Sequence, residues 1–192
     1  MRYVKKELLL KLLVTLMVLL LATFALGATM QEVNDVKYEV KQECTRIRRN
    51  CYLTINYSDM LLNAYVGKDN EIIISRGIAD SFNKGELLAV AMHEVGHVKY
   101  KHREQLDYYM AIRSFMLTNK AYRHDMEYKA DRFACDYFLR QGSYNYLPDA
   151  LKNLNRADMN KESITHPSLN NRIKKAIDYS YKKEGQYAQN KI

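Results

Sequence analysis

Residues 83–100 read NKGELLAVAMHEVGHVKY and have a strong helical pattern. We predict that a helix opens at the segment Asn83-Lys84-Gly85-Glu86. Its apolar residues recur at steps of three and four positions, which indicates that one face packs on a core. These residues are Leu87, Leu88, Ala91, Val95 and Val98.

The same helix carries the sequence His93-Glu94-Val95-Gly96-His97. Two histidines four residues apart differ by about 40° around a helix, so both imidazoles project from one face and can hold one metal ion. Glu94 lies between them, where a carboxylate can take a proton from a metal-activated water and pass it to a leaving amine. We expect this face to lie opposite the apolar stripe. A chance match to the pattern of residues 93–97 occurs in roughly one such chain in a hundred.

Two histidines leave a catalytic zinc one protein ligand short. We expect His102 to lie off the ligand face and in solvent. His124 stays open as a ligand, although its place at a predicted helix start favours a capping or exposed role. Glu127 is the better candidate, because it shares a helix face with Asp131, four residues on. One carboxylate can then bind the metal while the other accepts a hydrogen bond from a ligand imidazole.

The remaining pattern predicts one α+β domain over residues 29–192, because no repeat or proline-rich linker divides it. Extended segments are expected at 52–57, 64–66 and 71–75, with a Gly-Lys-Asp-Asn turn at 67–70 that joins the last two into a hairpin. Helical patterns are expected at 33–47 and 78–82, from about His124 to Gln141 with Gly142 as a stop, and at 144–156 and 168–182.

The N-terminus has the pattern of an export segment. Four basic residues and one acid in residues 1–11 precede an uncharged run, LLVTLMVLLLATFALGA, at 12–28. That run is long for a signal-peptide core and slightly short for a bilayer of about 30 Å. We assign residues 1–28 to a signal peptide or an N-terminal membrane anchor. In both cases we expect the domain to lie outside the cytoplasmic membrane, in the periplasm or the extracellular space.

Charge and cysteine content bear on two further questions, nucleic-acid binding and disulfide bonding. Three units of the net charge of +8 belong to residues 1–28, and no basic motif interleaved with aromatic residues follows, so we expect no nucleic-acid partner. Cys44 and Cys51 would lie about 10 Å apart on one helix, too far for a disulfide unless the helix ends near Arg49. Their pairing stays open, and Cys135 is expected to be a buried small residue.

Three motifs, in this order, resemble those of the M48 peptidases, a gluzincin family with membrane proteases and small exported minigluzincins. They are HEVGH at 93–97, EYKAD at 127–131, and Thr165-His166-Pro167-Ser168 followed by Arg172-Ile173. The resemblance also covers Asn63-Ala64-Tyr65, IIISRGI at 72–78 and GELLAVAMHE at 85–94, and spans about 60–175. It implies a zincin-type domain, with a small early β-sheet and two helices that carry HExxH and ExxxD.

The resemblance also implies a role for each matching residue around one zinc ion per chain. His93, His97 and Glu127 would be the zinc ligands, and Glu94 the general base and acid. Asp131 would be the partner of a ligand imidazole.

Around these residues, the resemblance implies that His166 lies near the open side of the metal, where a donor would stabilise an oxyanion. Arg172 would brace this region. Asn63, Ala64 and Tyr65 would belong to an edge strand that holds a peptide by strand addition. Residues 98–126 are too polar to span a bilayer, unlike the corresponding part of the larger relatives, so we expect a bare catalytic domain.

These expectations lead to a zinc metalloendopeptidase that hydrolyses exported or membrane-associated proteins. Its partners would be a protein or peptide substrate and, if residues 1–28 are retained, the membrane. The alternative is a catalytically silent, zinc-bearing binding or regulatory protein at the membrane surface. A third reading, association with a membrane surface or nucleic acid through basic charge, predicts a steep salt dependence of binding.

Overall fold

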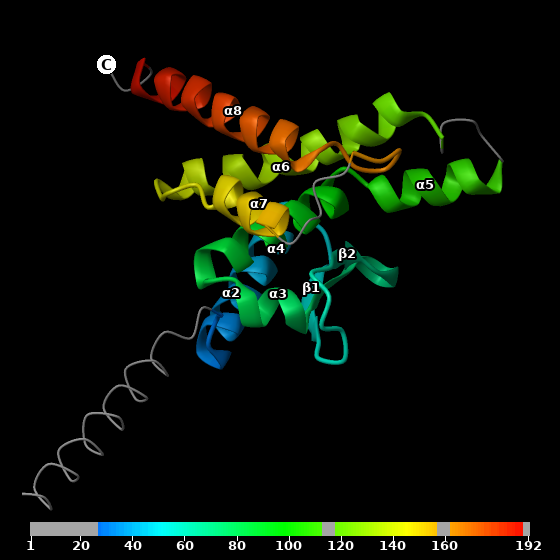
Figure 1. Ribbon diagram of the computed structural model, residues 1–192, viewed down its shortest axis with the longest axis horizontal. Coiled ribbons are helices and arrows are strands. Elements are labelled where there is room, and N and C mark those ends of the chain that lie inside the picture. The colour runs from blue at the N-terminus through cyan, green and yellow to red at the C-terminus, as the bar shows by residue number, and fades with distance from the viewer. Residues whose placement is uncertain (1–26, 113–117, 157–161, 190–192) are drawn as a thin grey trace, which may run out of the picture.

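The computed structural model describes residues 27–112, 118–156 and 162–189, which fold into a small sheet surrounded by helices (Figure 1). The expected α+β class is therefore confirmed. The signal peptide or anchor expected at 1–28 lies outside the described residues except for its last two. Among the described helices, none combines the length and the apolar composition that crossing a bilayer requires.

The sheet has three strands in the order β1-β3-β2, so β2 lies at one edge. Strands β1 (Tyr52–Asn56) and β3 (Glu71–Ser75) are parallel, and β2 (Ala64–Val66) pairs with β3 in the antiparallel sense. The predicted hairpin is confirmed. Its turn contains a short 3₁₀ segment in which Asp69 and Asn70 have φ of 55° and 59°, a left-handed conformation that Asp and Asn tolerate.

Helix α4 (Lys84–Lys99) is the central element of the fold. Asn83 and Glu86 form a reciprocal capping box: the Glu86 N–H donates to Asn83 Oδ1 at 3.0 Å, and the Asn83 N–H to Glu86 Oε2 at 3.1 Å. The helix packs against α2 (Met30–Arg46), the strands β2 and β3, and the later helices. It is therefore buried on nearly all sides, so the face that carries His93 and Glu94 is packed as well as the apolar stripe.

The later helices lie on the other side of α4 from the sheet (Figure 1). They are α5 (His102–Ala111), α6 (Lys120–Gln141), α7 (Leu147–Arg156) and α8 (Leu169–Gln189), and the short α3 (Arg76–Ser81) follows the sheet. Helix α6 ends at Gly142, with φ of 62°, as predicted. It begins at Lys120 rather than near His124, because the Asn119 side chain caps it by accepting from the Tyr122 N–H at 3.0 Å.

Cys44 and Cys51 form a disulfide, with their Cα atoms 5.6 Å apart. This pairing is possible because α2 ends at Arg46, and Arg48 then turns the chain with φ of 55°. Cys135 is free and fully buried, as expected.

Candidate metal centre

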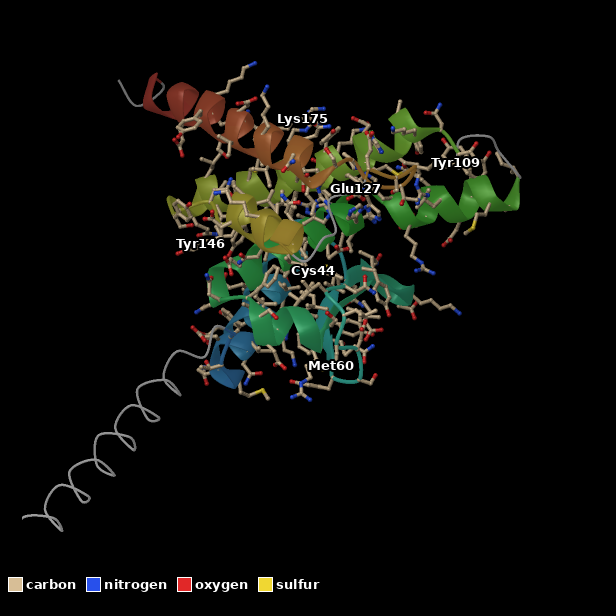
Figure 2. All side chains as sticks on the ribbon, viewed as in Figure 1. Cys44, Met60, Tyr109, Glu127, Tyr146 and Lys175 are labelled. Carbon is tan, nitrogen blue, oxygen red and sulfur yellow. A yellow bond between two sulfur atoms is a disulfide. The ribbon has the colours of Figure 1, made fainter. Side chains whose placement is uncertain are left out.

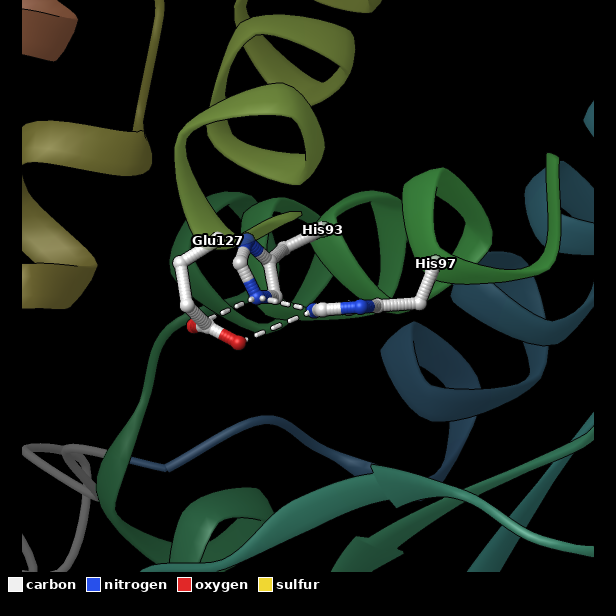
Figure 3. A group of neighbouring side chains, drawn as sticks. All are labelled: His93, His97 and Glu127. Atoms are coloured by element: carbon white, nitrogen blue, oxygen red, sulfur yellow. Dashed lines mark hydrogen bonds and ion pairs between the residues drawn. The ribbon is translucent and has the colours of Figure 1, made fainter. Parts of the chain in front are cut away.

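His93 and His97 on α4 and Glu127 on α6 point toward one another (Figure 3). The two Nε2 atoms are 3.0 Å apart, and the Glu127 carboxylate oxygens lie 3.6 Å from His93 Nε2 and 3.5 Å from His97 Nε2. A tetrahedral zinc ion bound at 2.0–2.1 Å separates its ligand atoms by about 3.3 Å. The three side chains therefore fit one metal ion without rearrangement.

Gly96 allows the two helices that carry these residues to approach closely. A Cβ atom at this position would lie 2.9 Å from Ala130 Cα and 3.1 Å from the Ala130 carbonyl oxygen on α6. Any other residue would thus force α6 away from α4. In Figure 2, Glu127 lies near the middle of the molecule, in the region where these two helices meet. We did not predict this role for Gly96, although its place inside HEVGH was visible.

Asp131 contacts the outer nitrogen of His93, which is Nδ1, the ring nitrogen that is not the candidate ligand atom. Its Oδ1 lies 2.9 Å from His93 Nδ1, and Arg172 on α8 donates to both carboxylate oxygens, with its Nη2 also 3.2 Å from His93 Nδ1. Burial raises the pKa of Asp131, but the Arg172 charge and the His93 contact outweigh it and lower that pKa below its usual value. Asp131 is thus an anionic acceptor, which places a proton on His93 Nδ1 and leaves Nε2 facing Glu127.

His102 lies against the outer nitrogen of His97, with the two Nδ1 atoms 2.8 Å apart. Only 3% of its surface is exposed, so the expectation that it lies in solvent is wrong. The reason is that α4 ends at Lys99 and the chain turns at Lys101, with φ of 57°, so that α5 begins with His102 over the site. Burial lowers the pKa of His102 to about 4, so its imidazole is neutral.

His124 lies outside the cluster, so the structure does not support it as a ligand. Its Nε2 donates to the Ser163 carbonyl oxygen at 2.8 Å, and its side chain is buried. The capping or exposed role that we favoured is also wrong, because His124 lies one turn inside α6.

The pKa values of His93 and His97 shift in opposite directions. Burial and the charge of Arg172 oppose a positive His93, yet its contacts with Asp131 and Glu127 raise its pKa to about 9. Burial, together with the charge on His93, lowers the pKa of His97 to about 3. A proton on His93 therefore offsets the Glu127 charge, and metal binding must displace it.

Glu127 remains ionised at neutral pH. Burial acts to raise its pKa, but contacts with His166 and His93 and the charge of Arg172 hold that pKa well below its usual value. His166 Nδ1 and Arg172 Nη1 each lie 3.3 Å from Glu127 Oε2. The His166 side chain is 62% exposed, so its imidazole reaches the centre from the solvent side.

Glu94 is buried beside the ligands and also lines the adjoining cleft. Burial raises its pKa to about 7, and the negative Glu127 adds to the shift while the positive His93 opposes it. A carboxylate with a pKa near neutrality can both accept and release a proton at physiological pH.

The cleft beside the centre has a volume of about 750 Å³. One side is the edge strand region, with Asn63, Ala64 and Tyr65 among its lining residues. Another side is apolar and comes mainly from α4 and α7; its residues include Val90, Leu147, Leu151 and Leu154. The cleft therefore places apolar side chains next to the candidate metal ligands.

The outer edge of β2 offers backbone groups to this cleft. Ser75 N donates to Asn63 O at 2.9 Å and Gly67 N to Glu71 O at 2.7 Å, so the alternation of an antiparallel pair directs the groups of Ala64 and Val66 away from β3. Arg103 Nη1 donates to the Val66 carbonyl oxygen at 3.0 Å. We did not predict this contact, because it depends on how α5 lies over the strand.

Family comparison agrees with this arrangement. The model of Peptidase family M48 matches residues 38–121, which include the edge strand and HEVGH. The model of Peptidase U49 matches residues 87–190, more than half of the chain, and includes HEVGH, Glu127, Asp131, His166 and Arg172. No individual curated protein matches the chain. The chain therefore belongs to the Peptidase U49 family, and its residues 38–121 are similar to Peptidase family M48.

Proposed function

We propose that the protein is a zinc-dependent metalloendopeptidase. The observation that carries the proposal is the convergence of His93, His97 and Glu127 at ligand spacing, beside buried Glu94 and a cleft that the edge strand β2 lines. Two imidazoles and one carboxylate are the ligand set of several catalytic zinc sites, whereas magnesium and calcium prefer oxygen ligands.

The three ligands would each have a defined part in holding the ion. The two Nε2 atoms and the Glu127 carboxylate would bind it, and Asp131 would keep the His93 ring in the required orientation. When bound, zinc would supply Lewis acidity, which polarises a carbonyl group and acidifies a water molecule.

Glu94 would move the proton. Its carboxylate would accept a proton from the attacking water and then deliver it to the nitrogen of the leaving amine. Its burial supports this role, because the raised pKa allows the carboxyl group to release the proton as readily as it accepts it.

His166 and β2 would position the substrate. An imidazole N–H of His166 would donate to the scissile carbonyl oxygen as negative charge develops there; the ring contacts Glu127 through Nδ1 and is exposed at the cleft. The outward N–H and carbonyl groups of Ala64 and the outward N–H of Val66 would pair with the backbone of an extended peptide, next to Asn63 and Tyr65. The Val66 carbonyl oxygen already accepts from Arg103. Arg172 would act indirectly, by holding Asp131 and Glu127.

We also propose where the enzyme acts. A basic start followed by an uncharged run to residue 28 supports export across the cytoplasmic membrane, with cleavage of this segment or its retention as an anchor. The substrates would then be exported or membrane-associated proteins.

The test compares Glu94→Gln with the wild type on an unfolded protein substrate such as casein. We expect hydrolysis to fall by about 10²- to 10⁴-fold while elemental analysis still finds one zinc per chain. Glu104→Gln is the matched control, because Glu104 is an exposed acid on α5 paired with Lys101. Undiminished hydrolysis by Glu94→Gln would exclude the mechanism. A wild type that holds one zinc and cleaves no peptide in a broad library would support the silent binding protein instead.

A further inference from the structure

We propose that His102 is a positioning residue for His97: its Nδ1 accepts a hydrogen bond from His97 Nδ1 and so aims His97 Nε2 at the metal. This inference rests on the proposed metal site and adds a residue that none of the three motifs contains. The two Nδ1 atoms are 2.8 Å apart, and both rings are largely withdrawn from solvent.

The donor and the acceptor follow from the chemistry of imidazole. A neutral ring has one N–H and one lone pair, and a ring that binds a metal through Nε2 must carry its proton on Nδ1. His97 Nε2 is the atom that lies 3.0 Å from His93 Nε2 and 3.5 Å from Glu127 Oε1. His97 Nδ1 is therefore the donor, and His102 must present an unprotonated Nδ1 with its proton on Nε2.

The fold holds the His102 ring firmly in this orientation. The ring is stacked on Tyr100, with centroids 5.7 Å apart and planes 22° apart, and meets the edge of the His97 ring at 4.9 Å and 75°. The Tyr100 carbonyl oxygen in turn accepts a hydrogen bond from the Gln105 side chain at 2.9 Å. Lys101 adopts a left-handed conformation, which is unfavourable for a non-glycine residue, and this turn brings His102 back over α4.

The two ligand histidines would then have different partners. His93 donates to the anionic Asp131, which Arg172 fixes, whereas His97 donates to a neutral imidazole. A carboxylate accepts a hydrogen bond more strongly than a neutral ring, and so makes the ligand more basic. His102→Asp should therefore strengthen rather than weaken the hold on the metal, provided that the carboxylate reaches the same Nδ1.

The first experiment measures the zinc affinity of the full chain by competition with a chelator. We expect His102→Ala to weaken binding by about 10- to 100-fold. His102→Asn should stay within about 3-fold of the wild type, because its amide oxygen can take the place of the acceptor nitrogen. His124→Ala is the matched control: His124 is also buried, but it contacts the Ser163 carbonyl outside the cluster, so its loss should leave zinc affinity unchanged.

A His102 side chain that only fills space would give different results from one that accepts a hydrogen bond. If His102 only fills space, His102→Leu should bind zinc like the wild type, and His102→Asn should be no better than His102→Ala. Either result would overturn the proposal. If both His102→Ala and His102→Leu fail to fold, ¹⁵N spectra of zinc-loaded Glu94→Gln decide the matter: we expect a protonated His97 Nδ1 and an unprotonated His102 Nδ1, and the reverse assignment would overturn it.

These readouts separate the two proposals. Zinc affinity does not depend on turnover, so a chain that binds zinc through a His102-dependent site and cleaves nothing would contradict the peptidase proposal and support this one. If the wild type hydrolyses peptides and His102→Ala binds zinc as tightly as the wild type, the peptidase proposal is supported and the His102 proposal is contradicted.

Discussion

Arg172 on α8 holds Asp131 on α6 through two parallel hydrogen bonds, from Nε to Oδ2 at 2.9 Å and from Nη2 to Oδ1 at 2.7 Å. The same Oδ1 lies 2.9 Å from His93 Nδ1, and all three side chains are buried. A helix from the C-terminal part of the chain thus fixes a ligand of the candidate metal centre. The planar guanidinium can bind both carboxylate oxygens at once, which a lysine cannot do.

The first prediction concerns this buried pair. Arg172→Ala leaves Asp131 buried without its main counter-charge, so the free energy of unfolding of the metal-free protein should fall by about 3–5 kcal/mol. Arg172→Lys should be less destabilised but should also bind zinc more weakly, because the forked geometry is lost. Urea denaturation and chelator competition measure the two effects. The control is Arg132→Ala, because Arg132 is an exposed arginine next to Asp131 in the sequence; we expect the free energy of unfolding to change by no more than about 0.5 kcal/mol. Equal effects of Arg172→Ala and Arg132→Ala would contradict the prediction.

The second prediction concerns the close contact of α4 and α6. Gly96→Ala places a methyl group within 3 Å of the Ala130 backbone, so it should cost about 1–3 kcal/mol and move Glu127 away from both histidines. Thermal unfolding and zinc affinity should therefore fall together. Gly185→Ala, in α8 with open space around it, should be neutral or stabilise the protein by up to about 1 kcal/mol. A Gly96→Ala protein with normal zinc affinity would show that the helices can separate without moving the ligands.

The third prediction concerns the reactivity of the Cys135 thiol as a function of pH. Burial raises the pKa of Cys135 to about 12, so at pH 8 only roughly one native molecule in ten thousand carries its thiolate. The native protein should therefore resist alkylation, and raising the pH from 7 to 9 should leave it resistant. Once the protein is unfolded, the pKa returns to its ordinary value of 9.0 and alkylation should accelerate over this pH range.

The disulfide fixes how many thiols become available in that experiment. Unfolding without a reductant should expose one thiol per chain, and adding a reductant should expose all 3 cysteines. Mass spectrometry after alkylation measures both numbers. Three labels without a reductant would mean that Cys44 and Cys51 are not paired.

The fourth prediction concerns metal addition. Zinc that binds only the folded chain should raise the melting temperature, with about 2.7 kcal/mol of stabilisation at a free concentration 100 times the dissociation constant. Glu127→Gln should greatly reduce this shift because it removes an anionic ligand. Glu162→Gln is the control, since Glu162 is exposed and paired with Lys120 outside the ligand cluster. An undiminished shift in Glu127→Gln would exclude Glu127 as a ligand.

Local patterns predicted much of the secondary structure, because short-range interactions determine it. The helix at α4 follows from the Asn83 cap and from apolar spacing, and the β2–β3 hairpin follows from its turn. The pairing of Cys44 and Cys51 stayed open, because it depends on the backbone turn at Arg48 after α2, which the residue pattern does not encode. The placement of His124 was wrong because α6 begins at Lys120, a few residues earlier than predicted. The placement of His102 was wrong because the chain turns at Lys101 and brings α5 over the site.

By itself, the sequence determined which residues could form a metal site. The helical period puts His93 and His97 on one face of their helix and Glu127 and Asp131 on one face of theirs, however the two helices pack. Only the tertiary structure decided that these two faces meet. Their contact requires a glycine at position 96 against Ala130, and the outer nitrogens find partners on other helices, Asp131 for His93 and His102 for His97. Such contacts join residues from different helices, and the local helical period does not encode how those helices pack.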